Sequence, residues 1–86
     1  DYECGHIRNI QSLCSANSAE LILVNPPQLC EESFDIPVCF EGISFIDGND
    51  WPGSKTPQNF YDDHHLVEAG ALDYSSWLAE RIVNLQ

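Results

Sequence analysis

The sequence predicts an α/β fold with parallel strands, of which this chain forms the C-terminal portion. Three observations favour this. Residues 5–16 place apolar side chains at helical spacing. The run LILV at 21–24 is apolar without a break and is followed by a turn signal, as is typical of a strand buried on both faces of a parallel sheet. Residues 67–85 form a long amphipathic pattern, which predicts a final helix.

The first two elements follow each other closely. The segment GHIRNIQSLCSA (5–16) predicts a helix whose apolar stripe consists of Ile7, Ile10, Leu13 and Cys14. Asn17 and Ser18 end that pattern, and the strand at 21–24 comes next. A helix followed by a buried strand is half of a βαβ unit, and the strand before the helix is missing.

Loops dominate the middle of the chain. Residues 25–42 contain three prolines and are expected to be a loop, whereas ISFID (43–47) predicts a short second strand. Residues 48–59 are dense in Gly, Pro, Asn and Asp and should be irregular. The last helix is expected to carry one apolar stripe, formed by Ala71, Leu72, Ser75, Leu78, Ile82 and Leu85. Trp77 lies off this stripe.

The 86 residues therefore predict one partial domain, residues 1–86. Two strands make a poor sheet, so the chain is not expected to close its own core. The earlier strands are expected in a preceding segment or in a second chain. The sequence contains no methionine, which indicates a processed product or an excerpt of a longer protein.

The four cysteines lack the C-x-x-C spacing of a metal site. The segment CEESFDIPVC is typical of a closed loop, and it predicts a Cys30–Cys39 disulfide formed in an oxidising compartment. The state of Cys4 and Cys14 remains open: they can be two half-buried free thiols on a helix, or they can form a disulfide. A bridge between them is awkward, because ten helical residues separate their Cα atoms by about 15 Å.

The charge balance narrows the class of partner. Three basic and fourteen acidic residues leave a formal charge of −11, which argues against binding a nucleic-acid backbone or an anionic membrane surface. No run of about 18 apolar residues is present, so no transmembrane helix is expected. The N-terminal segment DYECGHIRN lacks the layout of a signal peptide.

Four ionisable side chains, Asp62, Asp63, His64 and His65, lie between the irregular loop and the last helix. Loops at the carboxyl edge of an α/β sheet commonly carry chemistry. An Asp three residues before a His can fold back so that its carboxylate meets the imidazole Nδ1–H. This contact fixes the tautomer and stabilises the imidazolium, which makes a general base with its orienting group.

Two other interpretations remain open at these positions. Asp63 can serve as the N-cap of the last helix, while His64 simply faces solvent. Alternatively, Asp62, His64 and His65 can bind a metal ion together with Asp47 or Asp50. Adjacent side chains rarely converge on one ion, so the metal site ranks below the Asp–His pair.

The stretch YDDHHLVEAGA resembles the C-terminal catalytic block of SGNH (GDSL-like) hydrolases, especially those that act with membrane acyltransferases to O-acetylate sugars. The block resembles this chain in an aspartate, a histidine three positions later, a leucine and a Gly-Ala opening the last helix. The helix followed by AELILVNPP, and then ISFID, resemble the late helix and strands of the same fold. The resemblance implies a three-layer α/β/α (flavodoxin-like) domain with parallel strands.

By this resemblance, Asp62 orients His65, and His65 deprotonates a serine for attack on an ester carbonyl. Asp63 and His64 match variable positions and receive no catalytic role. The chain departs from the family because the Gly-Asp-Ser-like block and the oxyanion donors are missing. Asn25 and Asn49 are interpreted as turn residues, and no such block surrounds the serines, among them Ser12, Ser15, Ser18, Ser54, Ser75 and Ser76.

The resulting expectation is an extracytoplasmic serine esterase or O-acyltransferase that acts on acyl esters, chiefly acetyl esters, of carbohydrate. The partner is the segment or chain that carries the serine, no cofactor is expected, and the isolated chain should be inactive. Trp51 is interpreted as a loop anchor in preference to a sugar-stacking residue. The alternative function is a small secreted binding module, stapled by disulfides, whose acidic loop holds a metal ion. That module would need a self-contained core.

Overall fold

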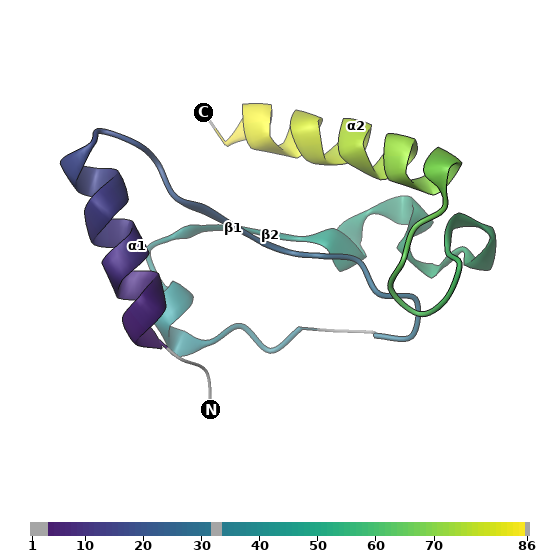
Figure 1. Ribbon diagram of the computed structural model, residues 1–86, viewed down its shortest axis with the longest axis horizontal. Coiled ribbons are helices and arrows are strands. Elements are labelled where there is room, and N and C mark those ends of the chain that lie inside the picture. The colour runs from purple at the N-terminus through teal and green to yellow at the C-terminus, as the bar shows by residue number, and fades with distance from the viewer. Residues whose placement is uncertain (1–3, 32–33, 86) are drawn as a thin grey trace.

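The computed structural model of the protein describes residues 4–31 and 34–85. It is a mixed α/β structure with a small two-stranded parallel sheet (Figure 1). The helices are α1 (Cys4–Ala16) and α2 (Glu68–Asn84), and the strands are β1 (Ile22–Asn25) and β2 (Ser44–Asp47). Four short 3-10 turns complete the order: η1 (Val38–Phe40), η2 (Gly48–Asp50), η3 (Pro52–Lys55) and η4 (Pro57–Asn59).

The expected elements are present within one or two residues of their predicted bounds. Helix α1 ends at the predicted place because Ser18 adopts a left-handed conformation, with φ of 56°. The amides of Ser18 and Ala19 then donate to the carbonyls of Ser15 and Cys14 at 3.2 and 2.8 Å. This pair of bonds is the Schellman motif, which satisfies carbonyls left free by the last turn of a helix.

The two strands pair in parallel, as predicted. Their register places Leu23 opposite Phe45 and Asn25 opposite Asp47, so the carboxyl ends of both strands meet at one end of the sheet. In the part of the chain that the structure describes, β1 pairs with β2 alone. The prediction that β1 is buried on both faces is not met within these residues, because Val24 is 39% exposed.

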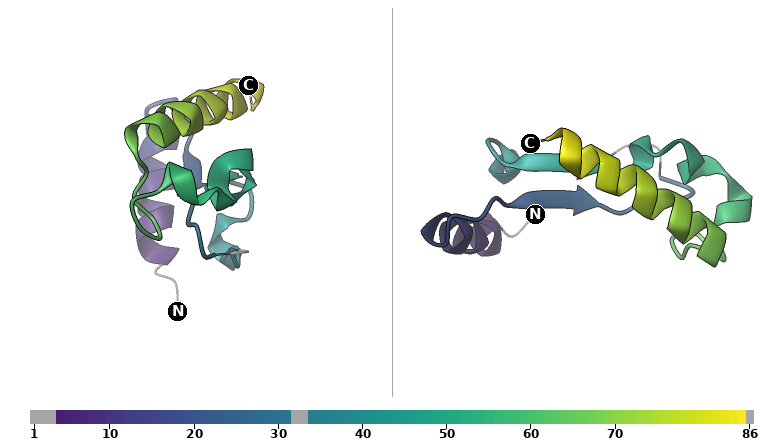
Figure 2. Two further views of the ribbon diagram at one scale, coloured as in Figure 1. Left: turned by 90° about the vertical axis from the view of Figure 1, so that its right-hand side faces the viewer. Right: turned by 90° about the horizontal axis from the view of Figure 1, so that it is seen from above.

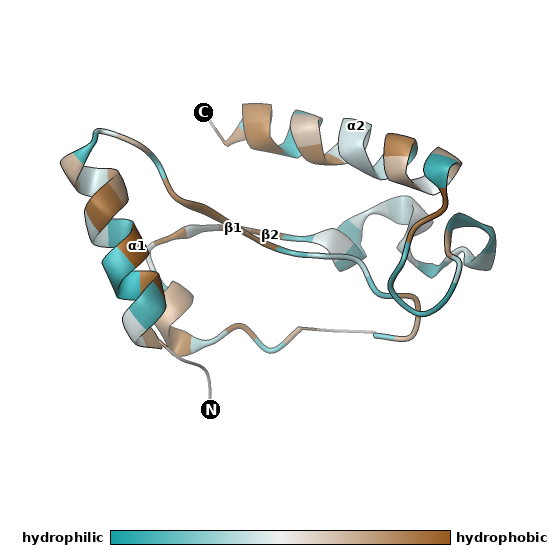
Figure 3. Ribbon diagram, viewed as in Figure 1, coloured by the Kyte–Doolittle hydropathy of each residue, from teal (hydrophilic) through white to brown (hydrophobic). Residues whose placement is uncertain are grey.

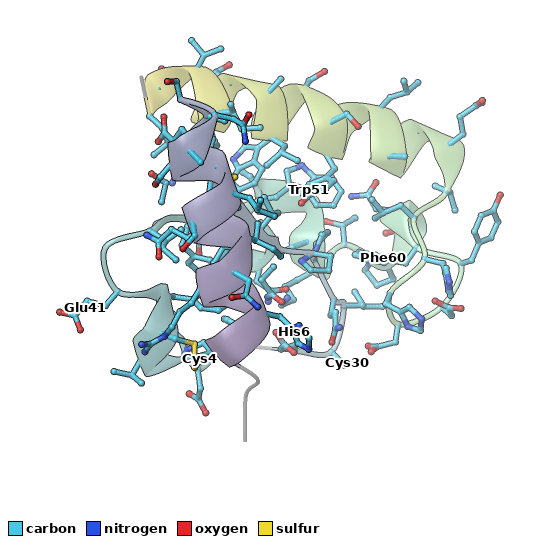
Figure 4. All side chains as sticks on the ribbon, turned by 60° about the vertical axis from the view of Figure 1, so that its left-hand side comes forward. Cys4, His6, Cys30, Glu41, Trp51 and Phe60 are labelled. Atoms are coloured by element: carbon cyan, nitrogen blue, oxygen red, sulfur yellow. A yellow bond between two sulfur atoms is a disulfide. The ribbon has the colours of Figure 1, made fainter. Side chains whose placement is uncertain are left out.

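The predicted Cys30–Cys39 disulfide is wrong. Cys39 instead bonds to Cys4, 35 positions away, and joins the first turn of α1 to η1 (Figure 4). Cys14 and Cys30 are free thiols. The segment 30–39 does not close on itself, because its two ends belong to different parts of the fold. Cys39 packs beneath α1 with Ile7 and Phe40, whereas the amide of Cys30 bonds to the carboxylate of Asp63 at the other end of the sheet.

A second packed cluster supports α2. Trp51 is only 1% exposed, and its indole Nε1–H donates to the carboxylate of Asp73 in α2 at 2.9 Å. Its ring lies 5.3 Å from that of Tyr74 and 6.5 Å from that of Phe60. Trp51 is therefore a loop anchor, as expected, and α2 rests mainly on η3 and η4 (Figures 1 and 4).

This anchoring also sets which face of α2 points inward. Tyr74 and Trp77, whose rings stack 6.0 Å apart, are half-buried together with Ala71, Leu78 and Ile82. Leu72, Ser75 and Leu85, which were expected on the apolar stripe, are exposed. The hydropathy colouring shows apolar residues along the whole length of the helix (Figure 3), and some of them, Leu72 and Val83, are exposed. Periodicity alone therefore did not define its inner face. Within the described residues, neither helix is long and apolar enough to cross a membrane.

Candidate functional site

The four residues singled out in the sequence lie at the carboxyl end of the sheet. The loops that follow β1 and β2 meet there, at the end of the strands opposite to the end where α1 lies (Figures 1 and 2). The amide of Leu29 donates to the carbonyl of Asp63 at 2.7 Å, and the amide of Cys30 donates to the Asp63 carboxylate at 2.9 Å. These two bonds fix the loop of Asp62–His65 to the loop that leaves β1.

The loop itself is closed at its base. Phe60 and Leu66 form an antiparallel bridge, and the Tyr61 amide donates to the carbonyl of His65 at 2.7 Å. Phe60 is buried, and α2 begins two residues after the bridge. Gly70 permits this arrangement, because a Cβ there would lie 2.6 Å from the carbonyl oxygen of Asn59. The base of the loop is therefore held between the Trp51 cluster and the first turn of α2, and residues 61–65 at its tip are exposed.

Asp62 and His65 make the contact expected from their spacing. The Asp62 Oδ2 atom lies 2.8 Å from His65 Nδ1, and the Oδ1 atom lies 3.1 Å from it. Asp62 Oδ1 also accepts hydrogen bonds from the backbone amides of His64 and His65 at 2.9 and 2.8 Å. The carboxylate is thus held in place by the backbone while it faces the imidazole.

These hydrogen bonds determine the charge of Asp62. The His64 amide, then the His65 side chain and amide, stabilise the ionised carboxylate and hold the pKa of Asp62 far below its usual range. An ionised Asp62 favours the imidazole tautomer with the proton on Nδ1 and leaves the Nε2 lone pair free. Both side chains are more than half exposed, so a bound molecule has direct access to His65.

Asp63 does not cap α2. The N-cap of that helix is Val67, and it makes no side-chain capping bond. Asp63 instead accepts hydrogen bonds from the thiol and the amide of Cys30, which lower the pKa of Asp63 and raise the pKa of the Cys30 thiol. Its role is to join the two loops, because its carbonyl and its carboxylate accept hydrogen bonds from the amides of Leu29 and Cys30.

Asp62, His64 and His65 also form a possible group of metal ligands, but the additional carboxylate expected from Asp47 or Asp50 is not part of it. Among the described residues, potential ligand atoms of Asp62, His64 and His65 all lie within 4.8 Å of one another. Asp47 and Asp50 do not belong to this group. The Asp47 carboxylate is occupied elsewhere, since its Oδ1 accepts from the Asn49 amide at 2.9 Å and from Asn25 Nδ2 at 3.1 Å.

Sequence reasoning missed a polar network between the strand ends and the site. Asn25 and Asn49, interpreted as turn residues, both donate side-chain amide hydrogens to the carboxylate of Glu31, at 3.3 and 3.0 Å. Asn49 Oδ1 accepts from the Gln28 amide at 3.0 Å. The parallel register that places Asn25 opposite Asp47 is the signal that indicates this network. The network sets the path of the loop that reaches Asp63.

No described serine hydroxyl is hydrogen-bonded to His65. Ser54 is buried and donates to the carbonyl of Asn49 at 2.8 Å, while Ser44 donates to the carboxylate of Glu20 at 3.0 Å. The described chain thus presents an oriented imidazole without a nucleophile beside it.

In comparisons with known proteins, no family model, no curated protein and no solved structure matches this chain. The functional argument therefore depends on the site itself and on the resemblance carried by residues 60–71.

Proposed function

We propose that the chain is the C-terminal part of an SGNH-type serine esterase or O-acyltransferase that acts on acyl esters of carbohydrate, with acetyl the expected acyl group. The observation that carries the proposal is the 2.8 Å contact between the Asp62 carboxylate and His65 Nδ1 at the carboxyl end of a parallel sheet. The complete domain would be a three-layer α/β/α structure of the flavodoxin type.

In this mechanism His65 acts as general base and then as general acid. Its Nε2 atom takes the proton of a serine hydroxyl as the serine oxygen attacks the ester carbonyl. The imidazolium then gives that proton to the alcohol that leaves, and an acyl-serine remains. Water or a sugar hydroxyl, deprotonated by the same imidazole, attacks the acyl-serine, and the imidazolium returns the proton to the serine oxygen as the acyl–oxygen bond breaks. Asp62 stays ionised throughout and stabilises the imidazolium.

The serine and the oxyanion donors must come from a preceding segment or a second chain. Uncovered apolar surface on the described residues supports such a partner. Val24 on β1 is 39% exposed, and Ile10 and Leu13 on α1 are 45% and 65% exposed. A cavity of about 270 Å³ lies on the same strand, lined by Leu23, Val24, Asn25, Pro26, Phe34, Phe40 and Phe45. Further strands paired to the edge of β1, with the helices that connect them, would cover this surface.

The Cys4–Cys39 disulfide supports an extracytoplasmic location, because such bonds persist in oxidising compartments. The alternative, a self-contained secreted binding module, also accounts for the disulfide. It requires a closed core, however, and the exposure of Val24, Ile10 and Leu13 argues against one.

The test is acetate release from p-nitrophenyl acetate and from an acetylated oligosaccharide by the domain assembled with its serine-bearing segment. We expect His65→Ala and Asp62→Asn to lower kcat by about 10³- to 10⁴-fold, because each removes a member of the proton-transfer machinery. His6→Ala, an exposed histidine on α1, is the matched control and should retain parental activity. The 86-residue chain alone should be inactive.

Either of two results would overturn the proposal. An assembled domain that keeps full activity after His65→Ala does not use this imidazole as its base. An 86-residue chain that hydrolyses the ester by itself, and loses the activity on His65→Ala, already contains a nucleophile.

A further inference from the structure

The side chains of His64 and His65 lie side by side at the tip of the loop, although they are adjacent in sequence. Their ring centroids are 4.1 Å apart, with the ring planes inclined by 42°. Adjacent residues usually point in different directions, so this convergence has a specific cause. Asp62 Oδ1 binds both backbone amides, which folds the chain so that both imidazoles come to the same carboxylate.

The geometry points to a transition-metal site formed by Asp62, His64 and His65, at which a bound ion would block His65 from acting as a base. His64 Nδ1 lies 3.9 Å and His65 Nδ1 lies 2.8 Å from the nearest carboxylate oxygen of Asp62. Each of the three residues offers one potential ligand atom, a carboxylate oxygen or an imidazole nitrogen, and these atoms lie within 4.8 Å of one another. The existence of the site does not depend on the proposed function, whereas its inhibitory effect does.

The ligand set selects the class of ion. Two imidazoles and one carboxylate suit Zn²⁺, Cu²⁺, Ni²⁺ and Co²⁺, whereas Ca²⁺ and Mg²⁺ prefer oxygen ligands alone. Ligand bonds to zinc are about 2.0 to 2.2 Å long, so two ligands on one ion lie roughly 3 to 4 Å apart. The separations of 3.9 and 2.8 Å between the Asp62 carboxylate and the two Nδ1 atoms lie close to that range, and both imidazoles are exposed. Three protein ligands would leave a further position for water or a substrate oxygen.

The backbone of the site is already ordered. The bond from Tyr61 to the carbonyl of His65 and the bond from Leu29 to the carbonyl of Asp63, both 2.7 Å, hold the two sides of the loop. The carboxylates of Asp62 and Asp63 and a formal chain charge of −11 make the surroundings favourable for a cation. Binding would therefore cost little reorganisation beyond the two imidazole rotamers.

The ion and the base use the same atoms. An ion on His65 Nδ1 would displace the hydrogen bond to Asp62, and an ion on Nε2 would occupy the lone pair that accepts the serine proton. In either case His65 cannot serve as general base while the ion is bound. Zn²⁺ would therefore inhibit the proposed esterase by competing at the imidazole, and a chelator would restore its activity.

The first experiment titrates the metal-free 86-residue chain with Co²⁺, followed by visible absorption, and with Zn²⁺, followed by competition with a chromogenic chelator. We expect one ion per chain. His64→Ala should weaken the affinity by about tenfold or more, because it removes one of three ligands, and His65→Ala should do the same. His6→Ala removes the third histidine of the sequence and should leave the affinity unchanged. The absence of saturable binding, or equal affinities for the parent and His64→Ala, would overturn the site.

A second measurement separates this inference from the proposed function. At a Zn²⁺ concentration between the dissociation constants of the parent and of His64→Ala, the ratio of esterase activity with Zn²⁺ to that without it should fall for the parent domain and stay closer to one for His64→Ala. If the ion binds but His65→Ala keeps its esterase activity, the proposed function fails and the metal site stands. If His65→Ala abolishes the activity and no ion binds, the metal site fails and the proposed function stands.

Discussion

The two ends of the sheet differ in how completely they are packed. We call residues 48–84, which meet at the carboxyl end, the Trp51 side. There the buried indole of Trp51 joins the irregular loop to α2, and its Nε1–H donates a hydrogen bond to Asp73. At the amino end, the disulfide side (residues 4–25 and 34–47), Ile7 and Phe40 are buried, but much of the apolar stripe of α1 faces solvent. The site thus lies on the side that the buried indole anchors, although Leu72 and Val83 of α2 are exposed there as well. A partner would complete the disulfide side without rebuilding the loop of Asp62–His65.

The largest expected difference comes from truncating one apolar side chain on each side. Trp51→Ala should lower the free energy of unfolding by about 3 to 5 kcal/mol, since it empties the cluster under α2 and leaves Asp73 without its donor. Leu13→Ala should change it by less than about 0.5 kcal/mol, because Leu13 is 65% exposed. Urea denaturation followed by circular dichroism measures both. A large loss for Leu13→Ala would mean that the stripe of α1 is covered in solution, and the contrast between the two sides would be wrong.

The disulfide should account for much of the stability of its side. The double change Cys4→Ala, Cys39→Ala opens a loop of sequence separation 35, for which loop entropy predicts a loss of about 3 to 4 kcal/mol. Hydrogen exchange should show the loss first in α1 and η1. Cys14→Ala, which removes a free thiol, is the control and should have a small effect. Equal protection of α1 with and without the bridge would contradict the view that the bridge compensates for a thin core.

The titration of the Asp62 carboxyl group tests whether the loop of Asp62–His65, on the Trp51 side, is folded as described. The Asp62 carboxyl carbon, followed by NMR, should titrate far below the ordinary aspartate pKa of about 3.9, because the folded loop lowers the pKa of Asp62. The unfolded chain binds the proton more readily, so the contribution of Asp62 to stability is fully present above about pH 4. It is lost as the pH falls through the lower, folded pKa. A midpoint near 3.9 in the folded chain would mean that the hydrogen bonds from His64 and His65 are not formed.

The thiol of Cys30 tests the connection between the two loops at the site. In a Cys14→Ala background, Asp63→Asn should speed alkylation of Cys30 at pH 8 severalfold, because the Asp63 carboxylate raises the pKa of this thiol. Asp62→Asn changes a neighbouring carboxylate and should leave the rate unchanged. Equal rates in the Asp63→Asn variant and its parent would show that Asp63 does not hold Cys30.

Much of this molecule was predictable because the decisive signals are local. Helix spacing located α1 and α2, and the three-residue separation of Asp62 and His65 indicated their contact. Pairings across long stretches of chain were not predictable in the same way. The partner of Cys39 is 35 residues away, and Asn25 reaches Asp47 only because the parallel register brings them together. The inner face of α2 also depended on a distant residue, since Trp51 brings Tyr74 inward.

A small stabilising change in α1 tests whether the disulfide side unfolds together with the rest. Ser18 holds a left-handed conformation, with φ of 56°, that a glycine adopts without steric cost. Ser18→Gly should therefore stabilise α1 by about 0.5 to 1 kcal/mol through the Schellman motif. If the chain unfolds as one unit, the urea midpoint of the Trp51 side should rise with that of α1. If only the amides of α1 gain protection against hydrogen exchange, the two sides open independently. Independent opening is the behaviour expected if, as proposed, a further segment packs on the disulfide side.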